Sequence, residues 1–223
     1  RSSKNLIFLG LGEYQFAVKK YPKHKNKFVF LPFSIDTKFW SSSEPKVENN
    51  NIAFIGNDGM RDYEFLEELI VSLPEYNFSV VSNKFNSTAN IQNIELFKGD
   101  WGKYTYSDSF IREIYKKSSL TILPIKNTYQ PSGQSVTLQS MSVGTPVMIT
   151  KTDGFWDPIN FINNKNIHLI EKNEVRVWKQ NITRYFEEKK EMEKVKIKGA
   201  ELILEKFNLD NFNQKLEEII FKK

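Results

Sequence analysis

Short apolar runs alternate with amphipathic stretches along most of the chain. Eight runs rich in β-branched and aromatic residues have the length and the flanking turn residues of strands. These predicted strands are Leu6–Leu9, Phe28–Leu31, Ile52–Ile55, Phe78–Val81, Ile94–Phe97, Leu120–Leu123, Val147–Thr150 and Ile167–Ile170. Several of them are apolar at every position, which is typical of strands that are buried on both faces.

Helical periodicity fills many of the intervals between these strands. One apolar stripe consists of Tyr63, Leu66, Leu69, Ile70 and Leu73, and another of Phe110, Ile111, Ile114 and Tyr115. After Glu171 the pattern is helical, and Asp210 is placed to cap the last helix. The alternation predicts an α/β fold, a Rossmann-like parallel sheet with helices on both faces, followed by C-terminal helices.

The composition excludes several classes of site. The chain has no cysteine, which removes disulfides, thiolate nucleophiles and thiolate zinc ligands. His24 and His168 are far apart, so we expect no metal. The longest apolar runs are far shorter than the roughly 20 residues that span a bilayer, which predicts a soluble protein of a reducing compartment. Because the sequence begins at Arg1, we expect it to be a piece of a longer chain.

The positive charge is concentrated near the start. Residues 1–45 carry eight Lys or Arg against three Asp or Glu, an excess equal to the whole chain's +5. The cluster consists mainly of Lys19, Lys20, Lys23, Lys25 and Lys27. A solvated helix end explains it, and anionic lipid or an acidic partner is the alternative. Basic and aromatic residues do not interleave as in nucleic-acid-binding modules, so no nucleic acid is expected.

Two glycine turns have the pattern of phosphate-binding loops. The first, Gly10–Gln15, lies between a strand and a helix, with Asp36 after the next strand, as in a dinucleotide-binding fingerprint. Gln15 stands where the third glycine belongs, which makes an NAD-binding enzyme the weaker reading. Asp36 also follows Pro32, in a segment that resembles a loop leaving the strand.

The second pattern combines two turns of one predicted sheet. Gly56–Gly59 precedes a helix that begins near Arg61, and Ser132 is placed to cap another helix. Gly133, Gln134 and Ser135 would then offer free backbone N–H groups to an anion. Gln139 lies one turn further on the same helix face.

These segments resemble the C-terminal, donor-binding half of a GT-B-fold glycosyltransferase, similar to the family 4 retaining enzymes. The matching segments, in order, are PFSIDTKFW (Pro32–Trp40), IAFIGNDGMRDYEFLEEL (Ile52–Leu69), REIYKKSSLTILP (Arg112–Pro124) and SGQSVTLQSMSVGTPVMITKTDGFWD (Ser132–Asp157). Only the last of them is a specific signature. The similarity covers roughly residues 28–157.

The resemblance implies a hexosyltransferase-type enzyme that transfers a sugar, with retention, from a nucleotide-sugar to a glycan or lipid-linked acceptor in polysaccharide biosynthesis. It implies no cofactor and no metal. The implied donor-binding residues are Gly56, Asn57, Arg61, Ser132, Gly133, Gln134, Ser135, Val136 and Gln139. Arg61 would stabilise the diphosphate, and no further catalytic residue is assigned. Trp101, Tyr104 and Tyr106 are candidates for stacking on the base, although packing in the core or in a lid explains them better.

The resemblance also divides the chain. Residues 1–45 correspond to the remnant of a preceding N-terminal domain, 46–190 to the donor-binding domain and 191–223 to helices packing on it. A cytoplasmic location is implied, with contact to the inner face of the membrane through the missing part.

Three departures from the family pattern leave alternatives open. Pro131 and Gln139 replace the family's paired glutamates, and Asn57 replaces an arginine. A GT-B-like sugar-nucleotide epimerase or an inactive nucleotide-sugar-binding domain is therefore the second reading.

Overall fold

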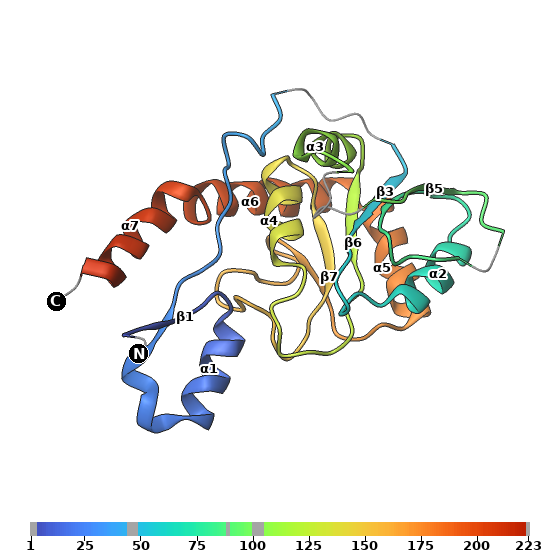
Figure 1. Ribbon diagram of the computed structural model, residues 1–223. Coiled ribbons are helices and arrows are strands. Elements are labelled where there is room, and N and C mark those ends of the chain that lie inside the picture. The colour runs from blue at the N-terminus through green and yellow to red at the C-terminus, as the bar shows by residue number, and fades with distance from the viewer. Residues whose placement is uncertain (1–3, 44–48, 88–89, 100–104, 222–223) are drawn as a thin grey trace.

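A six-stranded parallel sheet forms the centre of the molecule (Figure 1). The computed structural model describes residues 4–43, 49–87, 90–99 and 105–221. The strands are β3 (Asn51–Ile55), β4 (Asn77–Val81), β5 (Ile94–Phe97), β6 (Leu120–Leu123), β7 (Val147–Thr150) and β8 (His168–Ile170). All neighbouring pairs are parallel, in the order β5-β4-β3-β6-β7-β8. All the runs predicted as strands from Ile52 onward are thus confirmed.

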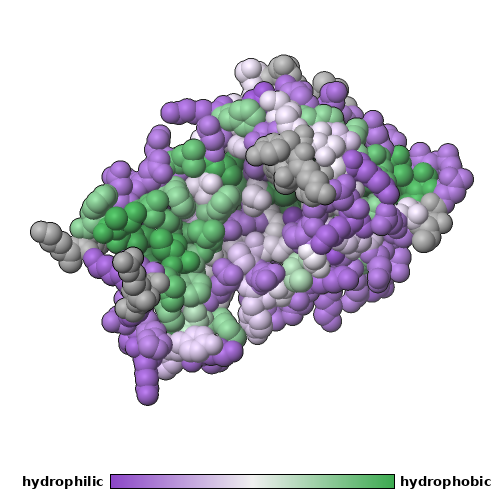
Figure 2. Space-filling view, in the orientation of Figure 1, coloured by the Kyte–Doolittle hydropathy of each residue, from purple (hydrophilic) through white to green (hydrophobic). Residues whose placement is uncertain are grey.

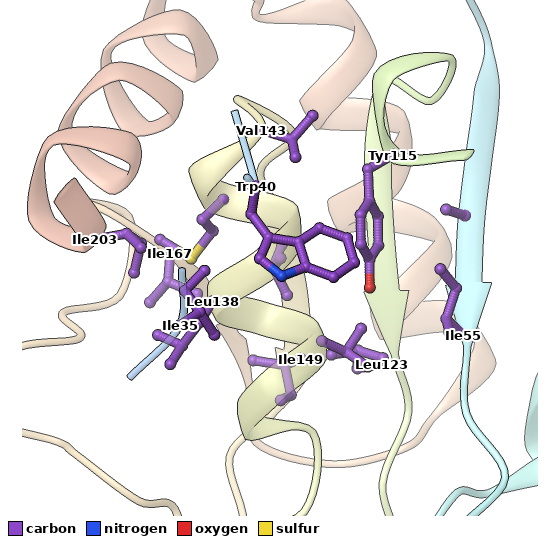
Figure 3. Close-up of a cluster of buried hydrophobic side chains, with 14 of the residues drawn as sticks. Ile35, Trp40, Ile55, Tyr115, Leu123, Leu138, Val143, Ile149, Ile167 and Ile203 are labelled. Atoms are coloured by element: carbon purple, nitrogen blue, oxygen red, sulfur yellow. The ribbon is translucent and has the colours of Figure 1, made fainter. Parts of the chain in front are cut away.

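Helices cover both faces of this sheet. Apolar side chains of α2 (Tyr63–Val71) and α5 (Val175–Glu187) pack in one buried cluster. Those of α3 (Asp108–Lys116), α4 (Gln134–Ser142) and α6 (Lys189–Lys206) pack in the other, part of which is shown in Figure 3. The expected α/β fold class is confirmed.

The position of strand β3 in the sheet explains why residues 52–55 are all apolar. Ile52 and Phe54 contribute to the α2–α5 cluster, whereas Ala53 and Ile55 contribute to the α3–α4–α6 cluster. Successive side chains of a strand point to opposite faces, and here both faces are covered by helices. All four side chains are therefore buried.

The strand order reverses direction between β3 and β6. The chain runs outward from β3 through β4 to β5, then returns to place β6 on the other side of β3. In open α/β sheets the ligand crevice lies at the carboxyl ends of strands at such a switch point. The loops after Ile55 and Leu123 are therefore where a ligand is expected to bind.

The first part of the chain forms a separate small unit. Strands β1 (Leu6–Phe8) and β2 (Phe28–Phe30) pair in parallel, and α1 (Leu11–Lys20) and the 3₁₀ helix η1 (Pro22–Lys27) connect them. This unit contacts the main domain at Leu11, whose N–H donates to Trp156 O at 2.6 Å. The two strands predicted here are also confirmed.

Residues after β2 run across α3 and α4. Trp40 packs edge-on against Tyr115, with ring centroids 6.1 Å apart (Figure 3). The carbonyl of Trp40 accepts a hydrogen bond from Ser142 Oγ. Arg112 donates to Phe39 O at 2.8 Å. The PFSIDTKFW segment is thus a strap that ties the first unit to the main domain. The predicted boundary between residues 45 and 46 lies outside the described residues, which leave out 44–48.

Helix α6 packs on α4, and the helix that follows α6 extends past it (Figure 1). The last helix, α7, spans Leu209–Phe221. The expectation that Asp210 caps α7 is wrong, because Asp210 lies inside its first turn. Asn208 occupies the capping place instead, and its Oδ1 accepts from the N–H of Asn211 at 2.8 Å. Within the described part of the chain, no helix combines the length and apolarity needed to cross a membrane.

Candidate functional site

Two loops meet at the switch point and are joined by backbone hydrogen bonds. The N–H of Asp62, after β3, donates to Pro124 O at 3.0 Å. The N–H of Lys126, after β6, donates to Met60 O at 2.8 Å. The glycine turn of β3 and the polar loop that leads to α4 therefore form one rigid edge.

Arg61 links this edge to the start of α4. Its Nη1 donates to Ser132 Oγ at 2.7 Å and lies 2.9 Å from Asp58 Oδ2. The side chain is only 3% exposed, and burial lowers the pKa of its guanidinium. Among the described residues its buried Nε has no hydrogen-bond acceptor. The guanidinium of Arg61 therefore lies next to the N-terminus of α4, as the sequence predicted.

Gly56 is required by the path of the Arg61 side chain. A Cβ at Gly56 would lie 2.4 Å from Arg61 Nε, closer than any real contact. The guanidinium reaches Ser132 only by folding back over this position. Glycine is therefore the residue that permits the arrangement.

The N-cap of helix α4 lies one residue later in the chain than the predicted cap, Ser132. Gly133, in the left-handed conformation with φ of 82°, holds the N-cap position, and no side chain caps the helix there. The expectation that Ser132 is the cap is wrong because its hydroxyl bonds to Arg61 and to Asp58 Oδ2 instead. The first turn, Gln134–Val136, consequently keeps N–H groups without intrahelical partners, as helix N-termini do.

The side chains on α4 have different environments. Gln134 Nε2 donates to Leu9 O at 2.9 Å, so this side chain holds the N-terminal unit in place. Gln139 is 8% exposed, and its buried Oε1 accepts no hydrogen bond from the described residues. An acceptor without a partner costs free energy unless a ligand supplies the donor.

Other expected site residues have structural partners. Asn57 Nδ2 donates to Gly99 O at 3.0 Å, and Asn57 Oδ1 accepts from the N–H of Asn83 at 2.6 Å. This side chain ties together the loops that follow β3, β4 and β5. Tyr106 stacks on Phe110, with ring centroids 4.5 Å apart, which favours packing over base stacking. Trp101 and Tyr104 lie outside the described residues.

A small cavity lies beside Asn57 and Tyr106 at the carboxyl ends of β3 and β4. Its volume is about 20 Å³, which holds a single water molecule. Within the described residues this cavity is therefore not a preformed pocket for a base.

The first glycine turn has a packing role. A Cβ at Gly10 would lie 3.1 Å from Pro131 Cβ, and one at Gly12 would lie 3.1 Å from the Gly154 backbone. Asp36 Oδ1 accepts from the N–H groups of Lys38 and Phe39 and so stabilises a turn. The glycines and the acid of the dinucleotide pattern thus have structural explanations.

Asp58 was not among the expected site residues. Its carboxylate contacts both Arg61 and Ser132. The signal in the sequence was an aspartate inside a glycine turn, where its side chain can accept from the backbone N–H two residues further on. Among the described residues no three His, Asp or Glu side chains gather as a metal site.

Comparison with known proteins gives a likeness of structure only. No family model matches the chain, and no curated protein matches its sequence. A glycosyltransferase from Rickettsia africae superposes with a TM-score of 0.80 at 15% identity, over 99% of this chain and 64% of that one. Sucrose-phosphate synthase from Thermosynechococcus elongatus gives 0.80 at 13% identity, over 99% and 58%.

A complex of Anabaena HepE with UDP-glucose superposes with a TM-score of 0.76 at 12% identity, over 100% of this chain and 65% of that one. The chain has one Rossmann-like half of the GT-B glycosyltransferase fold. It spans less than two thirds of the length of each of these GT-B structures. In the GT-B half described here, Arg61, Ser132 and Gly133 meet at the switch point of the sheet.

Proposed function

We propose that the chain is the donor-binding part of a glycosyltransferase that transfers a sugar from a nucleotide-sugar, with retention, to a glycan or lipid-linked acceptor. The observation that carries the proposal is the contact between Arg61 Nη1 and Ser132 Oγ at 2.7 Å, next to the N-cap of α4. It puts a guanidinium beside a helix N-terminus at the switch point. Both groups stabilise a diphosphate, and they do so without a metal ion.

Gln139 supports the same placement of the donor. It lies on α4 one turn beyond Ser135, and its Oε1 lacks a donor among the described residues. A ribose hydroxyl supplies such a donor when the diphosphate is at the start of α4. A complex of a structural relative, Anabaena HepE, contains UDP-glucose, which agrees with a nucleotide-sugar as the ligand of this fold.

The division into residues 1–45, 46–190 and 191–223 is part of the proposal. Figure 2 shows apolar side chains gathered on the side where β1 and α7 lie. Exposed residues of these two elements are Leu6, Ile7, Leu209, Ile220 and Phe221. Isolated parallel strand pairs are rarely stable, because parallel sheets are normally covered on both faces. This exposed surface supports a first unit that continues a preceding domain, which would complete the enzyme.

The test is a calorimetric titration of the chain with UDP, GDP, ADP and CDP, followed by Arg61→Ala with the nucleotide that binds best. We expect the variant to bind more weakly by about 1.5–3 kcal/mol, or about 10- to 150-fold, the range for a hydrogen bond to a charged group. Lys126→Ala is the control, because this exposed side chain is on the neighbouring loop. Equal affinity of Arg61→Ala and the parent chain would remove Arg61 from the site.

A binding domain without transfer activity is the second candidate. Pro131, packed against Gly10, stands where the resemblance to the family 4 enzymes implies a glutamate, so that carboxylate is missing. Assays of the complete protein separate the two candidates. Sugar transfer or donor hydrolysis supports the enzyme, and nucleotide-sugar binding without either supports the second candidate.

A further inference from the structure

The Asp58 carboxylate is held by four donors from both loops of the site. Its Oδ1 accepts from the backbone N–H groups of Met60, at 2.8 Å, and Arg61, at 3.1 Å. Its Oδ2 lies 2.9 Å from Arg61 Nη1 and accepts from Ser132 Oγ at 3.1 Å. Guanidinium, hydroxyl and backbone N–H groups are the same donors that bind a phosphate oxygen.

Asp58 and Arg61 differ greatly in their exposure to solvent. The Asp58 side chain is 44% exposed, whereas that of Arg61 is 3% exposed. An anion that approaches this edge of the sheet therefore meets the negative charge of Asp58 before it reaches the guanidinium. While the Asp58 carboxylate stays in place, neither Arg61 Nη1 nor Ser132 Oγ has a hydrogen left to donate to a diphosphate.

We propose that Asp58 is an internal competitor of the donor's diphosphate and thereby sets the affinity for the nucleotide-sugar. This inference rests on the proposed function. Asp58 leaves Arg61 and Ser132 when the donor binds, and its exposed side chain allows this without any change in the core. The adjacent Gly59 has no heavy atom within 4 Å of where its Cβ would be, so the turn has room for the movement.

The observed affinity equals the affinity of the molecules in which Arg61 is free, multiplied by the fraction of molecules in that state. Asp58→Asn removes the negative charge but keeps an oxygen that accepts from the N–H groups of Met60 and Arg61. We therefore expect the variant to bind the best nucleoside diphosphate more tightly, by about tenfold. Asp58→Ser should act in the same direction, because its short side chain can also accept from this turn. The corresponding nucleoside, which has no phosphate, should bind the parent and the variants equally.

The control is Asp62→Asn. Asp62 lies on the same turn, and its Oδ2 accepts from Asn173 Nδ2 and is not bonded to Arg61. The substitution removes one charge from the same region without changing the contact to the guanidinium. An equal gain with Asp62→Asn would show a general effect of charge and overturn the proposal.

Calorimetry on the folded variants, checked by thermal melting, distinguishes the remaining outcomes. If the parent binds a nucleoside diphosphate and both Asp58 variants bind it no more tightly, Asp58 is not a competitor and the proposed function stands. If neither the parent nor the Asp58 variants bind any of the four nucleotides, the proposed function fails together with this inference. Binding by the Asp58 variants alone would support both.

Discussion

At the scale of the residue, the site depends on how Arg61 is folded. The side chain passes over Gly56, is sealed from solvent, and bonds to Ser132 and Asp58. A buried guanidinium without partners would be costly in free energy. Asp58 supplies the negative charge that offsets this cost, and it also occupies Arg61 Nη1. Binding of a diphosphate replaces one anionic partner by another and leaves the burial unchanged.

Gly56→Ala should disrupt the site by displacing the Arg61 side chain. The new Cβ would lie 2.4 Å from Arg61 Nε, so the arginine must leave its position. We expect nucleoside diphosphate binding to weaken as much as in Arg61→Ala, and the free energy of unfolding to fall by about 1–3 kcal/mol. Calorimetry and urea denaturation measure the two effects. Gly59→Ala is the matched control, because nothing lies within 4 Å of its Cβ position.

The sequence predicted the positions of these residues better than their contacts. Gly56 and Arg61 stand out because a glycine turn follows an apolar strand and precedes a helix. The partner of Arg61, Ser132, lies 71 residues further along the chain, and no local pattern connects the two. The capping role expected of Ser132 failed for the same reason, because the hydroxyl has a stronger, charged partner.

At the scale of the element, local patterns were sufficient for the sheet. Strands buried on both faces, such as β3 and β6, are apolar apart from Asn51 and Thr121 and are bounded by turn residues, so their sequences identify them. Helix ends were less predictable. Both Ser132 and Asp210 are good capping residues by type, but Gly133 and Asn208 hold the capping positions. Tertiary contacts decide between neighbouring candidates of similar intrinsic preference.

The contact between α6 and α4 depends on Gly199. A Cβ there would lie 2.7 Å from Asn166 O and 2.8 Å from Met141 Cε, and the first of these is a backbone atom. Gly199→Ala should therefore displace α6 and lower the free energy of unfolding by about 1–3 kcal/mol, although alanine favours a helix. Urea denaturation measures the change. Lys198→Ala, at an exposed position of the same helix, should stay within about 0.5 kcal/mol of the parent; an equally mild effect of Gly199→Ala would contradict the close packing.

At the scale of the whole molecule, the exposed basic residues of the first unit are separate from the candidate site. The basic residues of the first unit, Lys19 and Lys20 of α1 and Lys23 and Lys25 of η1, are exposed. The edge of the sheet that carries Gly133 contains Arg61, whose charge is paired. The net charge of +5 therefore does not describe the candidate site, which depends on a buried cation and backbone dipoles.

Stability of the whole domain should fall in mild acid because of His168 on β8. Burial, together with the nearby charge of Arg184, lowers the pKa of this imidazole from 6.5 to about 4. Its Nδ1 lies 3.2 Å from Asn164 Oδ1, its ring packs against Tyr185, and its Nε2 has no partner among the described residues. The folded state therefore holds the neutral form.

Between pH 6.5 and about 4 the unfolded chain binds a proton that the folded chain does not, so stability decreases as the pH falls through this window. The shift corresponds to about 3 kcal/mol of stability present at pH 7 and lost near pH 4. We expect His168→Gln to flatten the pH dependence of the free energy of unfolding by about this amount in urea denaturations at pH 7, 5.5 and 4. His24→Gln is the matched control, because it makes the same substitution at an exposed histidine. If His168→Gln loses stability as steeply as the parent over this range, another group is responsible for the acid sensitivity.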